Sequence, residues 1–135
     1  VSTDSINGLI AKVIPLAGFL KGCIYLVDLR RMLLIPTVRI GKAEISEFKP
    51  LNYADAGGRS HPIVDALNSL TPIRQEDAFV NGEVVSIIAG RFGNETKSGV
   101  LYLQMSKELT RVDRSVSMLY FKAIKQCLND CLNLS

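Results

Sequence analysis

The first part of the sequence has its apolar residues spaced by three and four. Ser2, Thr3 and Asp4 precede this run as candidate N-caps, and Pro15 lies inside it. Such spacing predicts an amphipathic helix, which should kink or restart at the proline because proline lacks a backbone donor. The apolar positions are Ile6, Leu9, Ile10, Val13, Ile14, Ala17 and Leu20.

Two short apolar runs then indicate a β-hairpin. Cys23–Val27 and Leu33–Ile40 are rich in strand-forming residues and are separated by a polar segment that contains Arg30 and Arg31. We expect these two arginines at a solvated hairpin tip. Pro36 cannot donate a ladder hydrogen bond, so the second strand is expected at a sheet edge or at a bulge.

The middle of the chain is polar and irregular. Residues 42–60 contain Pro50 and the pair Gly57-Gly58, which predicts a long loop that forms a lid or a pocket wall. A short helix should follow Ser60, its expected N-cap, and a short strand is expected at Thr71-Pro72-Ile73. The helix is expected to place four residues on one face: Ile63, Ala66, Leu67 and Leu70.

A second hairpin is predicted from Val84–Phe92 and Val100–Met105, which are joined by a polar, glycine-containing segment. The first of these strands has apolar residues at both odd and even positions. We therefore expect it to be covered on both faces, with helices above and below the sheet.

The longest predicted helix begins at Thr110, with Asp113 in the capping-box position. Its apolar surface is wider than a single surface helix needs, which favours packing against a partner. The pattern assigns one side to Val112, Val116, Leu119, Ala123, Cys127 and Leu128, and a widening of that side to Tyr120, Ile124, Cys131 and Leu132.

This order of elements resembles the GAF domain family. The segments that carry the resemblance are Cys-Ile-Tyr-Leu-Val-Asp at 23–28, His-Pro-Ile-Val-Asp-Ala-Leu at 61–67 with Thr-Pro-Ile at 71–73, and Ser-Gly-Val-Leu-Tyr-Leu at 98–103. The resemblance implies an α+β fold of the GAF/PAS type. A central antiparallel sheet of about five or six strands would be flanked by the N- and C-terminal helices on one face, and by the short helix and long loop on the other.

The resemblance also implies a regulatory role. Residues 1–135 would form a single GAF-like domain of a longer signalling protein, which binds a small molecule, dimerises through its terminal helices, or does both, and controls a neighbouring output domain. A ligand-free structural dimerisation module is the alternative, and a GAF-type methionine sulfoxide reductase is a third, weaker hypothesis.

The composition and charge of the chain limit which classes of partner are expected. Hydrophobic residues make up 47% and charged residues 21%, which is ordinary for a globular domain, and the net charge of +3 comes from scattered basic residues. We expect no nucleic-acid partner, since there is no basic stripe. No apolar run is long enough to span a membrane, so no membrane contact by this domain is expected. Three cysteines without a paired motif predict a cytoplasmic location.

The sequence lacks the residue sets of an enzyme. It has one histidine, His61, whereas a Ser/His/Asp or Cys/His mechanism needs a base beside a nucleophile. No cysteine lies near His61 to anchor a bilin, and the residue set of cyclic-nucleotide-binding GAF domains is missing. The chain is therefore predicted to be a non-enzyme without a metal site, and no cofactor is assigned.

A ligand pocket, if formed, should lie between the sheet and the segment 42–80, where irregular chain covers a rigid scaffold. The candidate ligand-binding residues there are Tyr53, Arg59, His61 and Arg74. The two arginines suit an anionic ligand because a guanidinium forms forked hydrogen bonds.

Overall fold

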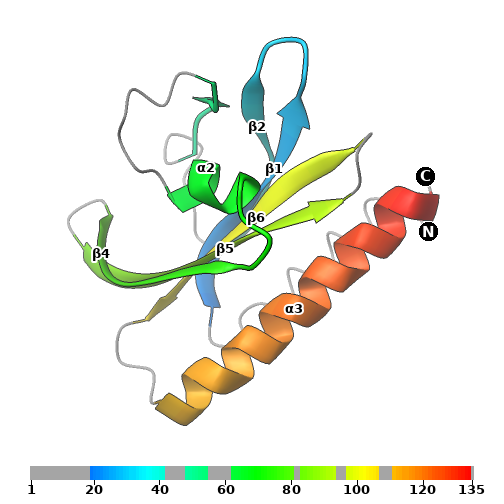
Figure 1. Cartoon of the computed structure of the whole chain (residues 1–135). Helices are drawn as coiled ribbons and strands as arrows, with labels where there is room; N and C mark the ends of the chain where they lie inside the picture. The colour runs from blue at the N-terminus through cyan, green and yellow to red at the C-terminus, as the bar shows by residue number, and fades with distance from the viewer. Residues whose placement is uncertain are drawn as a thin grey trace.

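The computed structural model describes residues 19–41, 48–54, 62–80, 83–93, 97–106 and 111–134. These residues form a curled sheet with one helix against each face (Figure 1). In chain order the elements are β1 (Phe19–Asp28), β2 (Leu33–Gly41), β3 (Leu51–Asn52), α2 (Pro62–Leu67), β4 (Ile73–Val80), β5 (Glu83–Gly93), β6 (Ser98–Ser106) and α3 (Arg111–Leu134).

All neighbouring strands of the sheet are antiparallel. Their order is β3-β2-β1-β6-β5-β4, so the first and last hairpins are joined in the middle by β1 and β6. β4 forms one edge, and the two-residue β3 covers only the beginning of β2 at the other edge. The segment 42–60, expected as a loop, therefore contributes a short strand.

Pro36 lies at a bulge, as its missing N–H predicted. The pairing of β1 with β2 skips Thr37, the residue directly after this proline, so β2 has one residue more than β1 at this point. The Thr37 hydroxyl donates a hydrogen bond to the Ile24 carbonyl at 3.0 Å. This bond holds the extra residue against β1.

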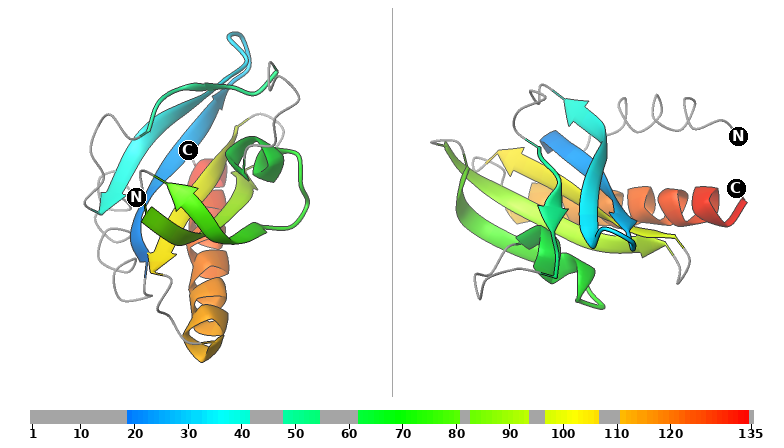
Figure 2. Two further views of the ribbon diagram at one scale, coloured as in Figure 1. Left: turned by 90° about the vertical axis from the view of Figure 1, so that its left-hand side faces the viewer. Right: turned by 90° about the horizontal axis from the view of Figure 1, so that it is seen from above.

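The curl of the sheet follows from irregular strand pairing. Besides the bulge at Thr37, the register shifts between Phe19 and Lys21 in β1 and between Gln75 and Ala78 in β4. Bulges increase the local twist of a strand. Three of them bend the six strands into the half-barrel that Figure 2 shows from two further directions.

The fold class expected from the resemblance is wrong. Strand residues outnumber helical ones in the described part of the chain, and its only helices are α2 and α3. The strands are longer than the sequence pattern indicated, and the bulged sheet curls into a half-barrel. The helix predicted over residues 6–20 lies outside the described residues, except that Phe19 and Leu20 belong to β1.

Both faces of the sheet are buried in its centre, which confirms the expectation for β5. One core lies under α3 and contains Ile24, Ile88, Phe92, Leu101, Leu103, Met105, Phe121, Ile124 and Leu128. The other lies under α2 and contains Cys23, Tyr25, Leu34, Phe48, Ile63, Val64, Ala66, Val85, Ile87, Ala89, Val100 and Tyr102. We name these two sides of the sheet the α3 face and the α2 face.

The short helix α2 ends earlier than its apolar pattern indicated. Its last turn is closed by hydrogen bonds from the N–H groups of Asn68 and Ser69 to the carbonyls of Asp65 and Ala66, both 3.2 Å. Leu70 follows this turn and is 99% exposed. The expectation that Leu70 shares the buried face of the helix is therefore wrong, because the helix stops before reaching it.

Candidate interaction surface

The helix α3 has a sequence suited to a long, uninterrupted helix. Its 24 residues include neither glycine nor proline, and many are good helix formers such as Leu, Lys, Met and Gln. At 1.5 Å per residue the helix is about 36 Å long. It crosses the α3 face of the sheet diagonally (Figure 1).

A close contact with β5 fixes the inward side of α3. The ring of Phe121 is fully buried at Gly90, where a Cβ on residue 90 would lie 2.8 Å from Cε1 and 3.0 Å from Cζ of the ring. Glycine allows this approach because it has no side chain. Ile124 and Leu128, three and seven residues further on, continue the buried stripe.

A hydrogen bond also joins α3 to the C-terminal end of β5. Gly93, with φ of 99°, ends β5 in a backbone conformation that favours glycine, and its N–H donates a hydrogen bond to Oδ1 of Asn129. The turn after β5 is thereby tied to α3. Together with Phe121, this bond fixes the rotation of α3 about its own axis.

The opposite side of α3 is also apolar, and it is exposed. Leu119 is 68% and Tyr120 43% exposed, and Ala123 and Cys127 are exposed as well. Leu119, Ala123 and Cys127 follow each other at four-residue intervals and so share one side of the helix. We name these three positions, 119, 123 and 127, the outer stripe of α3.

The sequence pattern merged these two sides into one. It grouped Leu128 with Leu119, but nine residues are about two and a half turns, so the two lie on opposite sides of the helix. It also grouped Cys127 with Leu128, whereas the Cys127 thiol is exposed and Leu128 is buried. It also missed Phe121, although the spacing of 121, 124 and 128 carries the signal of a buried stripe.

A group of polar side chains is buried on the α2 face. The Gln104 amide donates a hydrogen bond to the Tyr102 hydroxyl at 2.8 Å, and both residues are buried. The ring of Phe48 stands edge-on to Tyr102 and to Tyr25, with ring centroids 5.9 Å and 6.4 Å apart. Edge-on contacts of this kind are favourable for aromatic pairs. The described part of this face is thus occupied by its own side chains.

The buried thiol of Cys23 is poorly suited to nucleophilic chemistry. Burial raises its pKa from 9.0 to about 12, although Arg39 and a hydrogen bond with Tyr25 act in the opposite direction. Burial likewise raises the pKa of Tyr25, and the neighbouring Cys23 and Tyr102 add to this rise. The nucleophile in cysteine chemistry is the thiolate. At neutral pH Cys23 is a protonated thiol, and it donates to the Ile24 carbonyl at 3.7 Å.

The structure does not bring the expected ligand-binding residues together. Tyr53 lies next to β3 at one edge of the sheet and packs against the α2-face core. Arg74 lies in the opposite edge strand, β4, where it pairs with Ile88 on the α3 face and forms an ion pair with Glu76 at 3.4 Å. Arg59 and His61 lie outside the described residues.

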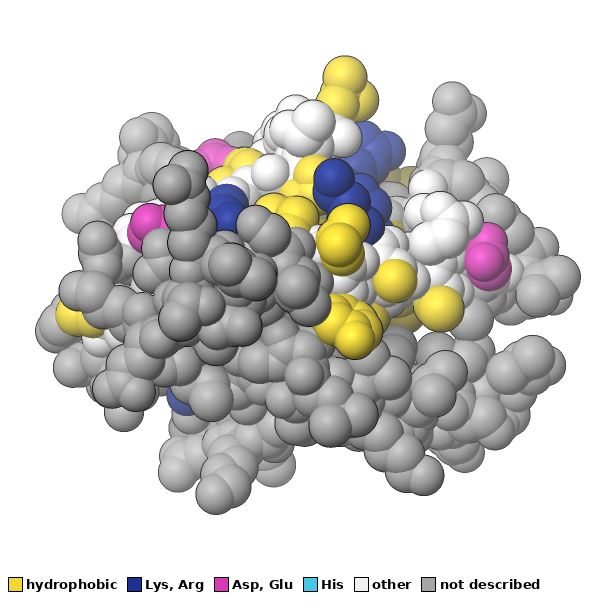
Figure 3. All heavy atoms as spheres, turned by 90° about the horizontal axis from the view of Figure 1, so that it is seen from below, with side chains coloured by type: hydrophobic (Ala, Val, Ile, Leu, Met, Phe, Trp, Pro, Cys, Tyr) yellow, Lys and Arg dark blue, Asp and Glu magenta, His cyan; other side chains and the backbone are white. Residues whose placement is uncertain are grey.

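The charged side chains of the described residues are dispersed. Figure 3 shows one face of the molecule, on which basic and acidic side chains are interspersed with hydrophobic ones. In the part of the chain that the structure describes, no three His, Cys, Asp or Glu side chains are grouped to hold a metal ion. Within the same part, no helix combines the length and hydrophobicity needed to cross a membrane.

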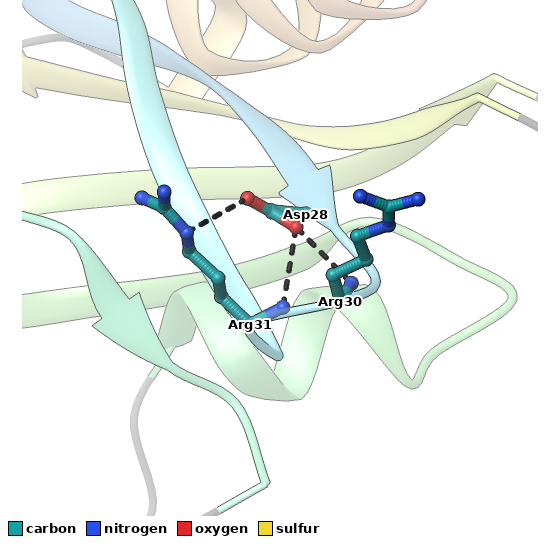
Figure 4. A network of polar contacts seen from close by, with 3 residues as sticks. All are labelled: Asp28, Arg30 and Arg31. Atoms are coloured by element: carbon teal, nitrogen blue, oxygen red, sulfur yellow. Dashed lines mark hydrogen bonds and ion pairs between the residues drawn. The ribbon is translucent and has the colours of Figure 1, made fainter.

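The hairpin tip between β1 and β2 is solvated, as expected. Arg30 and Arg31 are exposed, and their N–H groups donate to Oδ1 of Asp28 at 3.1 Å and 3.2 Å (Figure 4). The aspartate thus closes the turn by accepting local backbone bonds, which is a common use of this residue in turns. The Arg31 side chain is mostly exposed and lies 3.9 Å from Asp28 Oδ2.

Comparison of this chain with protein-family models, with curated proteins and with solved structures found no match.

Proposed function

We propose that this chain is a dimerisation module that joins two copies of its protein through the outer stripe of α3. The observation that carries the proposal is that α3 is apolar on two opposite sides, and that the sheet covers only one of them. A helix needs a single apolar side to pack on a sheet. In this proposal the second apolar side of α3 packs against a partner.

In the proposed dimer the exposed part of the outer stripe contributes free energy of association. Burial of a leucine side chain contributes about 1.5–3 kcal/mol, and a symmetric contact buries Leu119 of both copies. Tyr120 lies beside the stripe and is 43% exposed. Tyrosine is enriched at interfaces because its apolar ring can be buried while its hydroxyl keeps a polar partner.

In the proposed role the module pairs neighbouring output domains in a signalling protein of the cytoplasm. The free thiols of Cys23 and Cys127 support a reducing compartment. The GAF resemblance stays a prediction. The small-molecule role is not part of this proposal, because Phe48 packs between Tyr25 and Tyr102 on the face where a ligand was expected, and because Tyr53 and Arg74 lie at opposite edges of the sheet.

A non-enzymatic role is part of the proposal. Methionine sulfoxide reduction needs an accessible thiolate and a second thiol that resolves the oxidised form. The raised pKa of Cys23 and its burial argue against such a role for this thiol. Cys127 is accessible, but it lies on the opposite side of the molecule from the α2 face.

Sedimentation velocity over a range of protein concentrations tests the proposal. The wild-type chain should form a dimer of twice 14.8 kDa, and Leu119→Glu should weaken the dimer at least about a hundredfold, because two buried leucines are lost. Lys122→Gln is the control. It changes the charge by the same amount at an exposed position outside the stripe, and it should leave the dimer intact. A wild-type monomer at hundreds of micromolar would refute the proposal.

A further inference from the structure

We infer that the tip of the β1–β2 hairpin, residues 29–32, is a contact site for a membrane surface that carries anionic lipids. Leu29 and Met32 enter the headgroup region, and Arg30 and Arg31 bind the lipid headgroups. A contact of this kind stays at the surface of the bilayer and requires no membrane-spanning segment. It involves a different part of the chain from α3, so it does not depend on the proposed function.

The tip exposes two large apolar side chains at once. Leu29 is 65% and Met32 51% exposed, and the two residues between them, Arg30 and Arg31, are exposed as well. A single exposed leucine is common on protein surfaces, whereas this turn consists of four exposed residues in the order apolar, basic, basic, apolar. The tip projects beyond the other described elements in both Figure 1 and the left view of Figure 2. It can therefore reach a surface ahead of the rest of the fold.

The backbone of the tip is held in one conformation. Met32 has φ of 56°, a left-handed conformation that is uncommon for residues other than glycine. Its carbonyl accepts a hydrogen bond from the Tyr53 N–H at 3.1 Å, and Asp28 accepts bonds from the N–H groups of Arg30 and Arg31. Unusual backbone conformations that the surroundings maintain are found preferentially at binding sites. Because the tip is ordered in advance, contact with a membrane costs little backbone entropy.

The two guanidinium groups are available to an anionic surface. Oδ1 of Asp28 is engaged with backbone N–H groups, and the contact of its Oδ2 with the largely exposed Arg31 side chain is long, at 3.9 Å. The side chains of Arg30 and Arg31 extend to opposite sides of the turn (Figure 4). A basic side chain near an anionic leaflet strengthens binding about fivefold. The tip thus matches both the charge and the hydrophobicity of the headgroup region.

The small size of the tip favours a membrane over an acidic protein as the partner. A stable protein contact buries about 800 Å² on each side, which is more than a turn of four residues offers. The headgroup region of a bilayer is fluid and surrounds single side chains that enter it, so it accommodates a narrow, convex tip. The contact should be weaker than that of a single acyl anchor, with half-maximal binding at roughly millimolar lipid.

Tryptophan fluorescence tests whether the tip enters the bilayer. The chain contains no tryptophan, so one introduced indole reports on its own position. Leu29→Trp should give a blue-shifted emission with vesicles of phosphatidylcholine and phosphatidylserine, and no shift with phosphatidylcholine alone. Leu70→Trp is the matched control and should not shift, since Leu70 is 99% exposed but lies outside the tip. Emission of L29W that is unchanged by the anionic vesicles, or an equal shift in L70W, would overturn the inference.

Co-sedimentation with the same vesicles tests the two kinds of side chain in the otherwise native chain. R30Q/R31Q should weaken binding roughly tenfold to thirtyfold, because two attractions to anionic headgroups are lost. The backbone bonds to Asp28 remain in this variant. L29S/M32N should weaken binding at least about tenfold, since both apolar side chains are removed. Asparagine is chosen at position 32 because it tolerates a left-handed backbone.

A control of equal charge completes the experiment. R91Q/K122Q removes two positive charges at exposed positions outside the tip and should bind like the wild type. An equal loss in this control would mean that net charge alone drives binding, and would overturn the assignment to the tip. Equally tight binding to soluble poly-glutamate, without a shift of L29W, would identify an acidic protein as the partner instead. A monomer that binds vesicles refutes the proposed function alone, and a dimer that does not bind them refutes this inference alone.

Discussion

The ring of Phe121 lies so close to Gly90 that a single methyl group on β5 would overlap it. This contact decides which side of α3 is turned to the sheet and which side is left exposed. We predict that Gly90→Ala lowers the free energy of unfolding by about 1–3 kcal/mol, as expected when a packed core is overfilled. Urea denaturation measures this change.

The partner substitution Phe121→Leu is the control for this contact. In the double variant G90A/F121L the smaller side chain leaves room for the methyl group, so the two effects should not add. If G90A leaves the free energy of unfolding unchanged in the presence of Phe121, the described contact is wrong.

The two sides of α3 should respond differently to truncation. Ile124→Ala removes part of a buried side chain and should cost about 2–5 kcal/mol of folding stability. Leu119→Ala changes an exposed side chain and should change the stability of the monomer by less than about 0.5 kcal/mol. Both are measured by denaturation at a concentration below that of dimer formation. Equal losses in the two variants would mean that the assignment of the sides is wrong.

The sequence predicted α3 and the excess of its apolar surface, but not which side faces the sheet. Leu119 and Phe121 are only two residues apart and equally hydrophobic in a pattern, yet one is exposed and the other fully buried. The choice between them is made by Gly90, which is 31 positions away in sequence and offers space for one ring. Periodicity within a helix contains no information about such a distant partner.

Of the irregular points in the sheet, the sequence likewise predicted only some. Pro36 signalled the bulge in β2 because its missing N–H is a local property. The register shift between Gln75 and Ala78 could not be predicted from any single residue. It arises from how β4 fits against β5. The curl depends on the sum of these irregular points, and the expected sandwich of sheet and helices failed for this reason.

The expected ligand site failed to assemble for a topological reason. Tyr53 and Arg74 both fall within the segment 42–80 that was expected to cover the sheet. The order of the strands nevertheless places β3 and β4 at the two opposite edges of the sheet. The buried polar group around Tyr102 and Gln104 was missed because alternate positions of an apolar strand give no sign that a glutamine will be inside.

Stability should fall at alkaline pH. The pKa of Cys23 is raised from 9.0 to about 12 in the folded chain, mainly by burial, so above pH 9 the unfolded chain loses this proton before the folded chain does. The stabilising contribution is complete below pH 9 and is lost as the pH rises towards 12. The slope reaches at most about 1.4 kcal/mol per pH unit for this group.

Denaturation midpoints between pH 8 and pH 11 measure this effect. Tyr25 adds to the fall at the upper end of the range, since its pKa is raised as well. Cys23→Ala should give a shallower dependence on pH because one of the two groups is gone. The same slope in the variant and in the wild type would exclude Cys23 as a source of the pH dependence.

The alkylation rate of Cys127 as a function of protein concentration tests most directly whether the outer stripe is an interface. Cys127 is exposed in the single chain, whereas Cys23 is buried and serves as an internal control for folding. We predict that the rate constant, followed by mass spectrometry, falls several-fold between low micromolar and several hundred micromolar protein, while Cys23 stays unmodified throughout. A rate constant for Cys127 that is the same at both concentrations would contradict the account.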